Sequence, residues 1–126
     1  MNIAQWLAET ARLHPGAPAL LTGTRVDADY ATFARRAAAV GAHLVRDHGV
    51  MPGDRIALFA SNCTQYLECL YAIWWIGAAA IPINAKLHGK EAAWSAATPK
   101  RGSSSSMRIR AAHCSRPRPI CRLRCR

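Results

Sequence analysis

The C-terminal quarter of this sequence lacks acidic and aromatic residues altogether. The 126-residue chain has 7 Asp and Glu and 17 Lys and Arg, and residues 95–126 contain none of the acids but nine of the basic residues. They contain no Phe, Tyr or Trp, while Ser and Arg fill 14 of their 32 positions. Such a segment cannot bury enough apolar surface to offset the entropy lost on folding. We therefore expect residues 95–126 to form a disordered basic tail.

The sequence also lacks a disulfide framework, a secretory signal and a membrane span. Its five cysteines are odd in number and irregularly spaced. The first ten residues have no basic lead, and Glu9 interrupts their apolar part. The longest apolar stretch, residues 67–83, is broken by Glu68, Gly77 and Pro82 and is shorter than the roughly 20 residues that cross a bilayer. We expect a cytoplasmic protein with reduced thiols, in which residues 67–83 are a buried core segment.

The tail has donor side chains for a metal but no typical metal-binding spacing. Adjacent His and Cys side chains seldom both reach one ion, and no Cys-x-x-Cys pair is present, so we predict no zinc site. The Arg-rich residues 108–126 would bind phosphate backbones non-specifically, without aromatic side chains to stack on bases. The four candidate zinc ligands are His113, Cys114, Cys121 and Cys125.

Residues 1–94, in contrast, carry regular hydrophobic patterns. Residues 3–13 and 31–48 have the apolar spacing of amphipathic helices, and residues 17–21 and 25–30 read as two strands of a hairpin that turns at Gly23. We expect Gly49 to cap the second helix and Pro52-Gly53 to turn the chain into the next strand. The first helix should bury one stripe, made up of Ile3, Trp6, Leu7, Ala11 and Leu13.

Residues 53–84 are the central predicted unit, a strand, a helix and a second strand. Residues 56–60 and 78–83 are short continuous apolar runs, typical of parallel strands covered on both faces. The helical pattern between them ends at Ile76 and has the length of a right-handed crossover. A further helix is expected to begin at residues 90–94. The predicted fold class is α/β, with a β-hairpin, amphipathic helices and one parallel βαβ unit.

Ser61 and Asn62 follow the first strand of this unit and are the best candidate for a ligand site. Ligands collect at the carboxyl edge of open α/β sheets, and helix N-terminal amides attract anions. The glycines that let a phosphate approach the backbone are missing here. Asn62 and Gln65 have the spacing of a capping box, so we expect helix capping rather than phosphate binding.

No local pattern supports acid–base or nucleophilic catalysis. Cys63 and Cys69 lie on one predicted helix, where free cysteines are usually small buried hydrophobes. Asp27 and Asp29 lie on one side of a predicted strand and read as a solvent-facing pair. We predict no catalytic, cofactor-binding or metal-binding residues in this chain. The histidines without a positioned partner in the sequence are His14, His43, His48 and His88.

Four motifs within residues 3–94 resemble, in order and spacing, the N-terminal portion of the adenylate-forming ligase superfamily, particularly acyl-CoA synthetases. Asp-Tyr-Ala-Thr-Phe at residues 29–33 is similar to the family's Thr-Tyr-x-Glu-Leu, and residues 52–58 resemble its Gly-Asp-Arg-Val-Ala strand. Ser61-Asn62 is similar to the turn that follows. Residues 77–84 resemble Ala-Gly-x-x-x-Val-Pro-Leu-Asn, and Lys86-Leu87 stands where Arg-Leu is usual.

The resemblance implies a family that activates a carboxylic acid with ATP and magnesium and transfers the acyl group to coenzyme A, as in fatty acid metabolism. The family's phosphate loop, its Tyr-Gly-x-Thr-Glu segment, its hinge Asp and its C-terminal catalytic Lys have no counterpart here. We therefore expect residues 1–94 to be a partial N-terminal domain, inactive by itself and with no cofactor of its own, followed by the tail at residues 95–126.

The alternative is a small α/β binding protein whose Arg-rich tail contacts nucleic acid or an anionic membrane. Loss of a partner at moderate salt on deletion of residues 95–126 would favour this alternative.

The composition change at residue 95 resembles out-of-frame translation of a GC-rich gene. We predict that the chain is a ligase sequence truncated or frameshifted after about residue 94. Reading the coding DNA around codon 95 should reveal another frame that continues the family pattern, and the absence of that pattern from both alternative frames would contradict the hypothesis.

Overall fold

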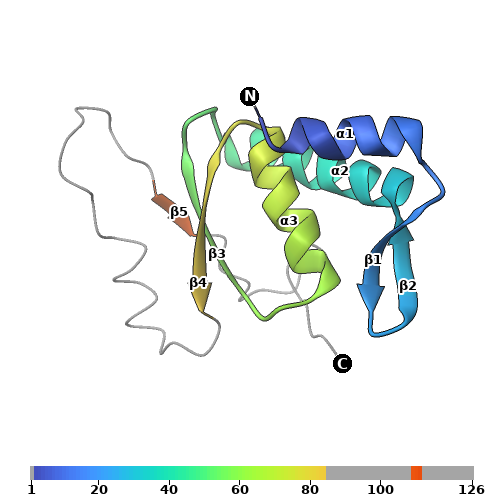
Figure 1. The fold of residues 1–126 in the computed structure, drawn as a ribbon. Coiled ribbons are helices and arrows are strands. Elements are labelled where there is room, and N and C mark those ends of the chain that lie inside the picture. Colours follow the sequence, from blue (N-terminus) through green and yellow to red (C-terminus); the bar gives the residue numbers. More distant parts are fainter. Residues whose placement is uncertain (1, 85–108, 112–126) are drawn as a thin grey trace.

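The computed structural model describes residues 2–84 and 109–111, which form helices and strands in the order α1, β1, β2, α2, β3, α3, β4 and β5 (Figure 1). Strands β1 and β2 form an antiparallel hairpin, and a separate parallel sheet has the order β4-β3-β5. Helix α3 lies between the hairpin and the parallel sheet, with α1 and α2 side by side across one end (Figure 1). The element bounds are Ala4–Leu13 for α1, Pro18–Thr22 for β1, Arg25–Asp29 for β2, Tyr30–His48 for α2, Arg55–Ala60 for β3, Thr64–Trp75 for α3, Ala79–Asn84 for β4 and Ile109–Ala111 for β5.

The hairpin and the second helix confirm the turn chemistry expected from the sequence. Gly23 has a φ of 61°, and Thr22 pairs with Arg25 across the turn. Gly49 ends α2 with a φ of 59°, and its N–H donates to the carbonyls of Leu44 and Val45. Glycine has no Cβ, so it adopts this left-handed backbone without steric cost.

The parallel βαβ unit is also confirmed. Strands β3 and β4 pair in parallel register from Arg55 with Ala79 to Ala60 with Asn84, and α3 is the crossover between them. The face of the sheet that α3 covers contributes Ile56 and Leu58 to a buried cluster. This cluster also contains Val50, Ile73 and Ala78.

The segment considered for a membrane span, residues 67–83, is divided between α3 and β4. Ile73 and Ile83 within it are buried, whereas Trp75 and Pro82 are exposed. None of the helices in residues 2–84 is long and apolar enough to cross a bilayer.

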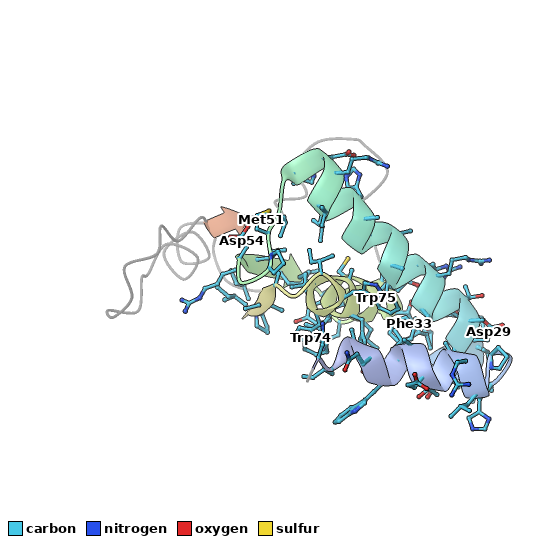
Figure 2. The ribbon with its side chains drawn as sticks, turned by 90° about the horizontal axis from the view of Figure 1, so that it is seen from above. Asp29, Phe33, Met51, Asp54, Trp74 and Trp75 are labelled. Carbon is cyan, nitrogen blue, oxygen red and sulfur yellow. The ribbon has the colours of Figure 1, made fainter. Side chains whose placement is uncertain are left out.

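A second buried cluster joins α1, the hairpin and α2. Phe33 lies between α1 and α2 beside α3 (Figure 2) and contacts Tyr71 edge to face, with ring centroids 5.1 Å apart. Tyr71 in turn packs edge to face on Trp74 at 5.1 Å. The aromatic side chains of α3 therefore reach the cluster on the hairpin side. The buried members of that cluster are Leu7, Leu20, Ala28, Phe33 and Ala37.

The predicted buried stripe on α1 is wrong in part. Ala4 and Leu7 are buried, but Trp6 and Leu13 are 63% and 59% exposed, and Ile3 is exposed as well. Helix α1 has apolar side chains on two faces, and only the face with Ala4 and Leu7 packs against the rest of the described chain. Helical spacing identifies which residues share a face but not which face is covered.

Small side chains set the contact between α2 and α3. Ala37 and Ala72 are fully buried. A Cβ built on Gly41 would lie 3.0 Å from Ile76 Cγ2 and 3.2 Å from the Ala72 carbonyl oxygen. Contacts this short leave no room for a side chain at position 41. The absence of a side chain there therefore lets α2 and α3 approach closely.

The basic tail contributes one short element to the described residues. Ile109–Ala111 forms β5, which pairs in parallel with β3 from Arg55 with Ile109 to Ala57 with Ala111. The sequence had predicted disorder at these three residues. The expected helix at residues 90–94, the remaining tail and all four candidate zinc ligands lie outside the described residues.

We predict that Gly41→Val lowers the free energy of unfolding by about 1–3 kcal/mol, the usual cost of overpacking a close contact. Urea unfolding of the purified chain measures the change. Gly16→Val is the matched control, because a Cβ at Gly16 meets no atom within 4 Å. Equal stability of the two variants would contradict the role given to Gly41.

Candidate functional site

The residues at the carboxyl end of β3 face the hairpin across an open groove. The groove has a volume of about 1050 Å³ and runs between the hairpin and the first turn of α3. This groove is the candidate ligand site, because its lining includes Asn62, one of the two residues that the sequence marked as the best candidate for ligand binding. Its lining includes Leu21, Thr22, Arg25, Arg36, Asn62 and Leu67.

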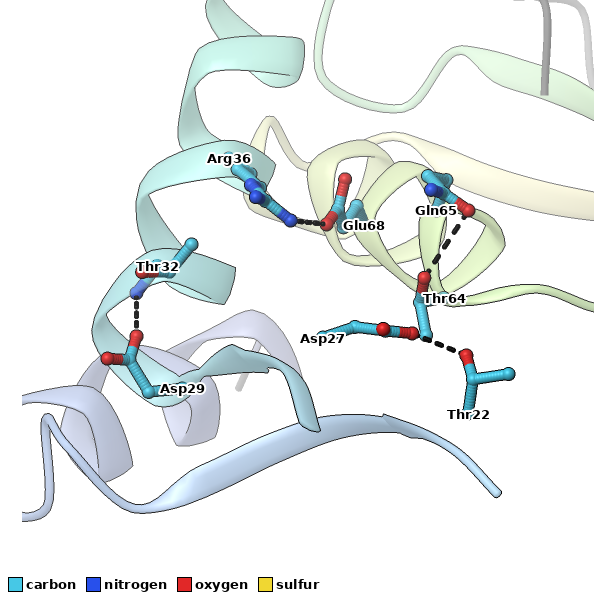
Figure 3. Close-up of polar contacts among 8 residues, drawn as sticks. All are labelled: Thr22, Asp27, Asp29, Thr32, Arg36, Thr64, Gln65 and Glu68. Atoms are coloured by element: carbon cyan, nitrogen blue, oxygen red, sulfur yellow. Dashed lines mark hydrogen bonds and ion pairs between the residues drawn. The ribbon is translucent and has the colours of Figure 1, made fainter. Parts of the chain in front are cut away.

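The capping box predicted for Asn62 and Gln65 is wrong. Helix α3 begins at Thr64 with Cys63 as its N-cap residue, and no side-chain hydrogen bond caps it. Gln65 is therefore the second helical residue rather than the third, and its Oε1 accepts a 3.3 Å hydrogen bond from Thr64 Oγ1 (Figure 3). Ser61 and Asn62 are exposed and lie before the helix.

Asp27 and Asp29 are not the solvent-facing pair that the sequence predicted. Both are half-buried, and each holds local structure. Asp27 accepts a hydrogen bond from the Thr22 hydroxyl and pairs with Arg25 Nε at 2.8 Å (Figure 3 shows the bond to Thr22). The hydrogen bond from Thr22 is the main cause that lowers the pKa of Asp27, and the contact with Arg25 adds to it. Asp27 therefore stays ionised as a brace across the hairpin.

Asp29 is the N-cap of α2. Its Oδ1 accepts the backbone N–H of Thr32 at 2.7 Å (Figure 3). Hydrogen bonding from the Thr32 side chain and then from this N–H lowers the pKa of Asp29. The signal was present in the sequence, since Asp is among the preferred N-cap residues and the helical pattern begins directly after it.

An ion pair between α2 and α3 lies at the edge of the groove and was not foreseen. Arg36 Nη1 lies 3.0 Å from Glu68 Oε1 (Figure 3). Glu68 is only 8% exposed and is the single buried charged residue of the described part of the chain. A charge inside an otherwise apolar helical run could have pointed to such a partner, because buried carboxylates are paired.

The histidines do not form a catalytic group with the groove. His14 is the C-cap residue of α1, and His88 lies outside the described residues. His43 was expected to lack a positioned partner, but its Nδ1 contacts Asp47 Oδ2 at 2.5 Å, and its ring packs edge to face on His48. His43 and Asp47 lie one turn apart near the end of α2, and neither lines the groove.

The polar contacts at the end of α2 stabilise a helix terminus. Arg46 Nε lies 2.6 Å from Asp47 Oδ1. The hydrogen bond from Arg46 is the main cause that lowers the pKa of Asp47. Basic side chains in the last turn, here Arg46 and His48, also complement the helix dipole.

The described cysteines and other possible metal ligands form no metal-binding cluster. Cys63 and Cys69 are both half-buried rather than fully buried, and Cys69 packs against the cluster around Ile73. Within residues 2–84 and 109–111, no three His, Cys, Asp or Glu side chains are grouped so that they could hold a metal ion. Asp27 thus braces the hairpin, Asp29 caps α2, and Glu68 is held in an ion pair.

The chain belongs to the AMP-binding enzyme family, whose model matches residues 7–98. It is 43% identical over 53 residues to the crotonobetaine/carnitine–CoA ligase of Salmonella paratyphi A, a stretch that covers 42% of this chain and 10% of that ligase. The expectation of an adenylate-forming ligase fragment, reached from the four motifs, is confirmed at the level of the family.

Solved structures agree on the fold. The O-succinylbenzoate coenzyme A synthetase of Bacillus subtilis, solved in complex with AMP, superposes with a TM-score of 0.62 and 26% identity over 68% of this chain and 22% of that chain. The N-terminal subdomain of Klebsiella oxytoca NpsA gives a TM-score of 0.67 over 75% of this chain and 24% of that chain, and at 19% identity it shows the fold alone. The chain thus spans less than a quarter of these solved relatives.

We predict that Asp29→Ala lowers the free energy of unfolding most at pH values above about 4 to 5. In this range an ordinary Asp, with a pKa of about 3.9, is ionised in the unfolded chain as well. Because the folded pKa is lowered, the stabilisation is fully present above the unfolded pKa and is lost as pH falls through the folded pKa. Urea unfolding across a pH series measures the difference from the unsubstituted chain.

Glu9→Ala is the control for this series, since the Glu9 pair with Arg12 is exposed and such pairs contribute little. A stability difference for Asp29→Ala that stays constant from neutral to acidic pH would contradict the capping role.

Proposed function

We propose that this chain is the N-terminal scaffold of an ATP-dependent carboxylic acid:CoA ligase and that it contributes no catalytic group of its own. The observation that carries the proposal is the family match over residues 7–98. In the complete enzyme the reaction would form an acyl-adenylate and pyrophosphate, and then an acyl thioester with coenzyme A. ATP, magnesium, coenzyme A and a small carboxylic acid are the ligands proposed for that complete enzyme.

The structural roles of the family-like motifs support this proposal. Asp29, in the first motif, caps α2, and Ile56 and Leu58, in the second, are core residues of β3. Gly77, which opens the last motif, has a φ of 75°, and its carbonyl accepts the N–H of Gly53 at 2.9 Å. The first motif thus caps α2, and the later two shape the βαβ unit.

The relatives support the class of substrate without fixing the acid. The Salmonella enzyme is named for crotonobetaine and carnitine, and the Bacillus enzyme for O-succinylbenzoate. Both names specify a carboxylic acid joined to coenzyme A. We propose the same class for the complete enzyme, acting in the cytoplasm, with fatty acids among the candidate acids. The alternative, a binding protein whose basic tail contacts nucleic acid or an anionic membrane, stays a hypothesis, since nearly all of that tail lies outside the described residues.

We predict that the purified chain shows no acid-dependent ATP–pyrophosphate exchange above background with a panel of carboxylic acids. The reason is that Asp29 and Glu68 are engaged in a cap and an ion pair, and that the family's phosphate loop and catalytic Lys have no counterpart in this sequence. The Salmonella ligase serves as positive control. Exchange that depends on both the acid and the chain would contradict the proposal.

A further inference from the structure

Strand β3 lies in the middle of the parallel sheet, and its two edges are covered to different extents (Figure 1). On one edge β4 pairs with all six residues of β3, from Arg55 to Ala60. On the other edge the described part of the chain provides only β5, which pairs with residues 55–57. The second edge of β3 therefore depends on Ile109–Ala111, a segment from the basic part of the sequence.

The backbone groups of β3 are divided between these two edges. The Asp54 carbonyl accepts the N–H of Ala79 at 2.8 Å and thus points toward β4. Successive residues of a strand direct their N–H and C=O groups alternately to its two sides. Ile56 and Leu58 therefore bond toward β4, whereas Ala57 directs its N–H toward β5.

Arg110 is the residue of β5 that meets these groups, because it stands opposite Ile56 in the register. In a parallel pair, a residue bonds to the two residues that flank its register partner. The register therefore predicts that Arg110 donates its N–H to the Arg55 carbonyl and accepts the N–H of Ala57. The residues on either side of Arg110 turn their backbone groups away from β3.

An open edge at this place would be unfavourable in two ways. Ala57 is only 3% exposed, and a buried N–H without a partner lowers stability. Ile56 and Leu58 are buried as well, and an apolar strand with an open edge is a template for pairing with another chain. Pairing with β5 removes both problems.

The segment that covers this edge has the features of a terminal edge strand. It is three residues long and contains Arg110, and Arg108 precedes it in the sequence. Short edge strands with charged residues resist the addition of a further strand. Residues 85–108, between β4 and β5, exceed the length of about a dozen residues that a crossover between parallel strands requires. The same chain can therefore supply the strand.

We propose that Ile109–Ala111 is an intramolecular cap on β3, which occupies the second edge of this strand and keeps one copy of the chain from pairing with another. The cap satisfies the Ala57 N–H and replaces an apolar edge with a short, charged one. This role is independent of ligase chemistry and goes beyond the proposed function.

Two proline variants of the full 126-residue chain test the cap. Arg110→Pro removes the N–H that faces β3, whereas Ala111→Pro removes an N–H that points away, a position where an edge strand tolerates proline. Amide exchange measured by NMR compares Ala57, which faces β5, with Leu58, which faces β4. We expect Arg110→Pro to speed exchange at Ala57 about tenfold or more and to leave Leu58 unchanged. Ala111→Pro should exchange like the unsubstituted chain.

Analytical ultracentrifugation tests whether the cap keeps copies apart. The unsubstituted chain and Ala111→Pro should sediment as monomers over a concentration series. Arg110→Pro should self-associate as its concentration rises, because its β3 edge is open. Circular dichroism and the exchange rate at Leu58 check that each variant keeps the fold.

A measurement on the unsubstituted chain distinguishes a cap within one copy from an exchange between two. In a mixture of isotope-labelled and unlabelled chain, NMR contacts between β3 and β5 should arise within one copy. Contacts between copies would overturn the proposal, because β5 would then join the copies rather than separate them. Unchanged exchange at Ala57 in Arg110→Pro would also overturn it, as would equal effects of the two proline variants. Faster exchange at Ala57 in an Arg110→Pro chain that stays monomeric would contradict the role in keeping copies apart.

Discussion

The close packing of α3 on α2 holds the two buried clusters of this chain together. Gly41 lets the helices approach so closely that a Cβ at this position would lie 3.0 Å from Ile76 Cγ2 and 3.2 Å from the Ala72 carbonyl oxygen. The ion pair from Arg36 to Glu68 joins the same two helices. One cluster lies on the hairpin side of α3, and the other lies between α3 and the sheet. Without this contact the hairpin with α1 and the βαβ unit would be two small units, each with too little core to be stable alone.

The same contact determines which apolar side chains of the described residues are buried and which are exposed. Helix α3 uses one side for the sheet and another for α2 and Phe33, so its first turn, with Leu67, remains open toward the hairpin. Trp6 on α1 is likewise exposed. Large apolar side chains in such positions are typical of surfaces that contact another polypeptide. The family model matches residues 7–98, and the chain spans 22% of the Bacillus ligase.

The sequence predicted those parts of the fold that local chemistry determines. Gly23 and Gly49 adopt the positive φ expected at a hairpin turn and a helix end, and the apolar runs of β3 and β4 form the parallel pair. In each case a few neighbouring residues decide the conformation. The four motifs identified the family for the same reason, since they record local turns and strand patterns.

The errors concern contacts that local spacing does not specify. The covered face of α1 depends on where α2 and α3 lie, so helical periodicity could not show that Trp6 is exposed. The capping box failed because α3 begins at Thr64, which moves Gln65 out of reach. The pairs of Arg36 with Glu68 and of His43 with Asp47 depend on helix packing and side-chain direction. Strand β5 pairs with β3 from more than fifty residues away, a contact that no local pattern in a basic tail encodes.

The central claim is that this chain provides scaffold without nucleotide-binding machinery, and isothermal titration with ATP and with an acyl-adenylate analogue tests it most directly. The account predicts no saturable binding of either ligand up to about 1 mM, the upper end of typical KM values. The Salmonella ligase, titrated in the same way, should bind. Saturable one-to-one binding of the analogue to the isolated chain would contradict the account.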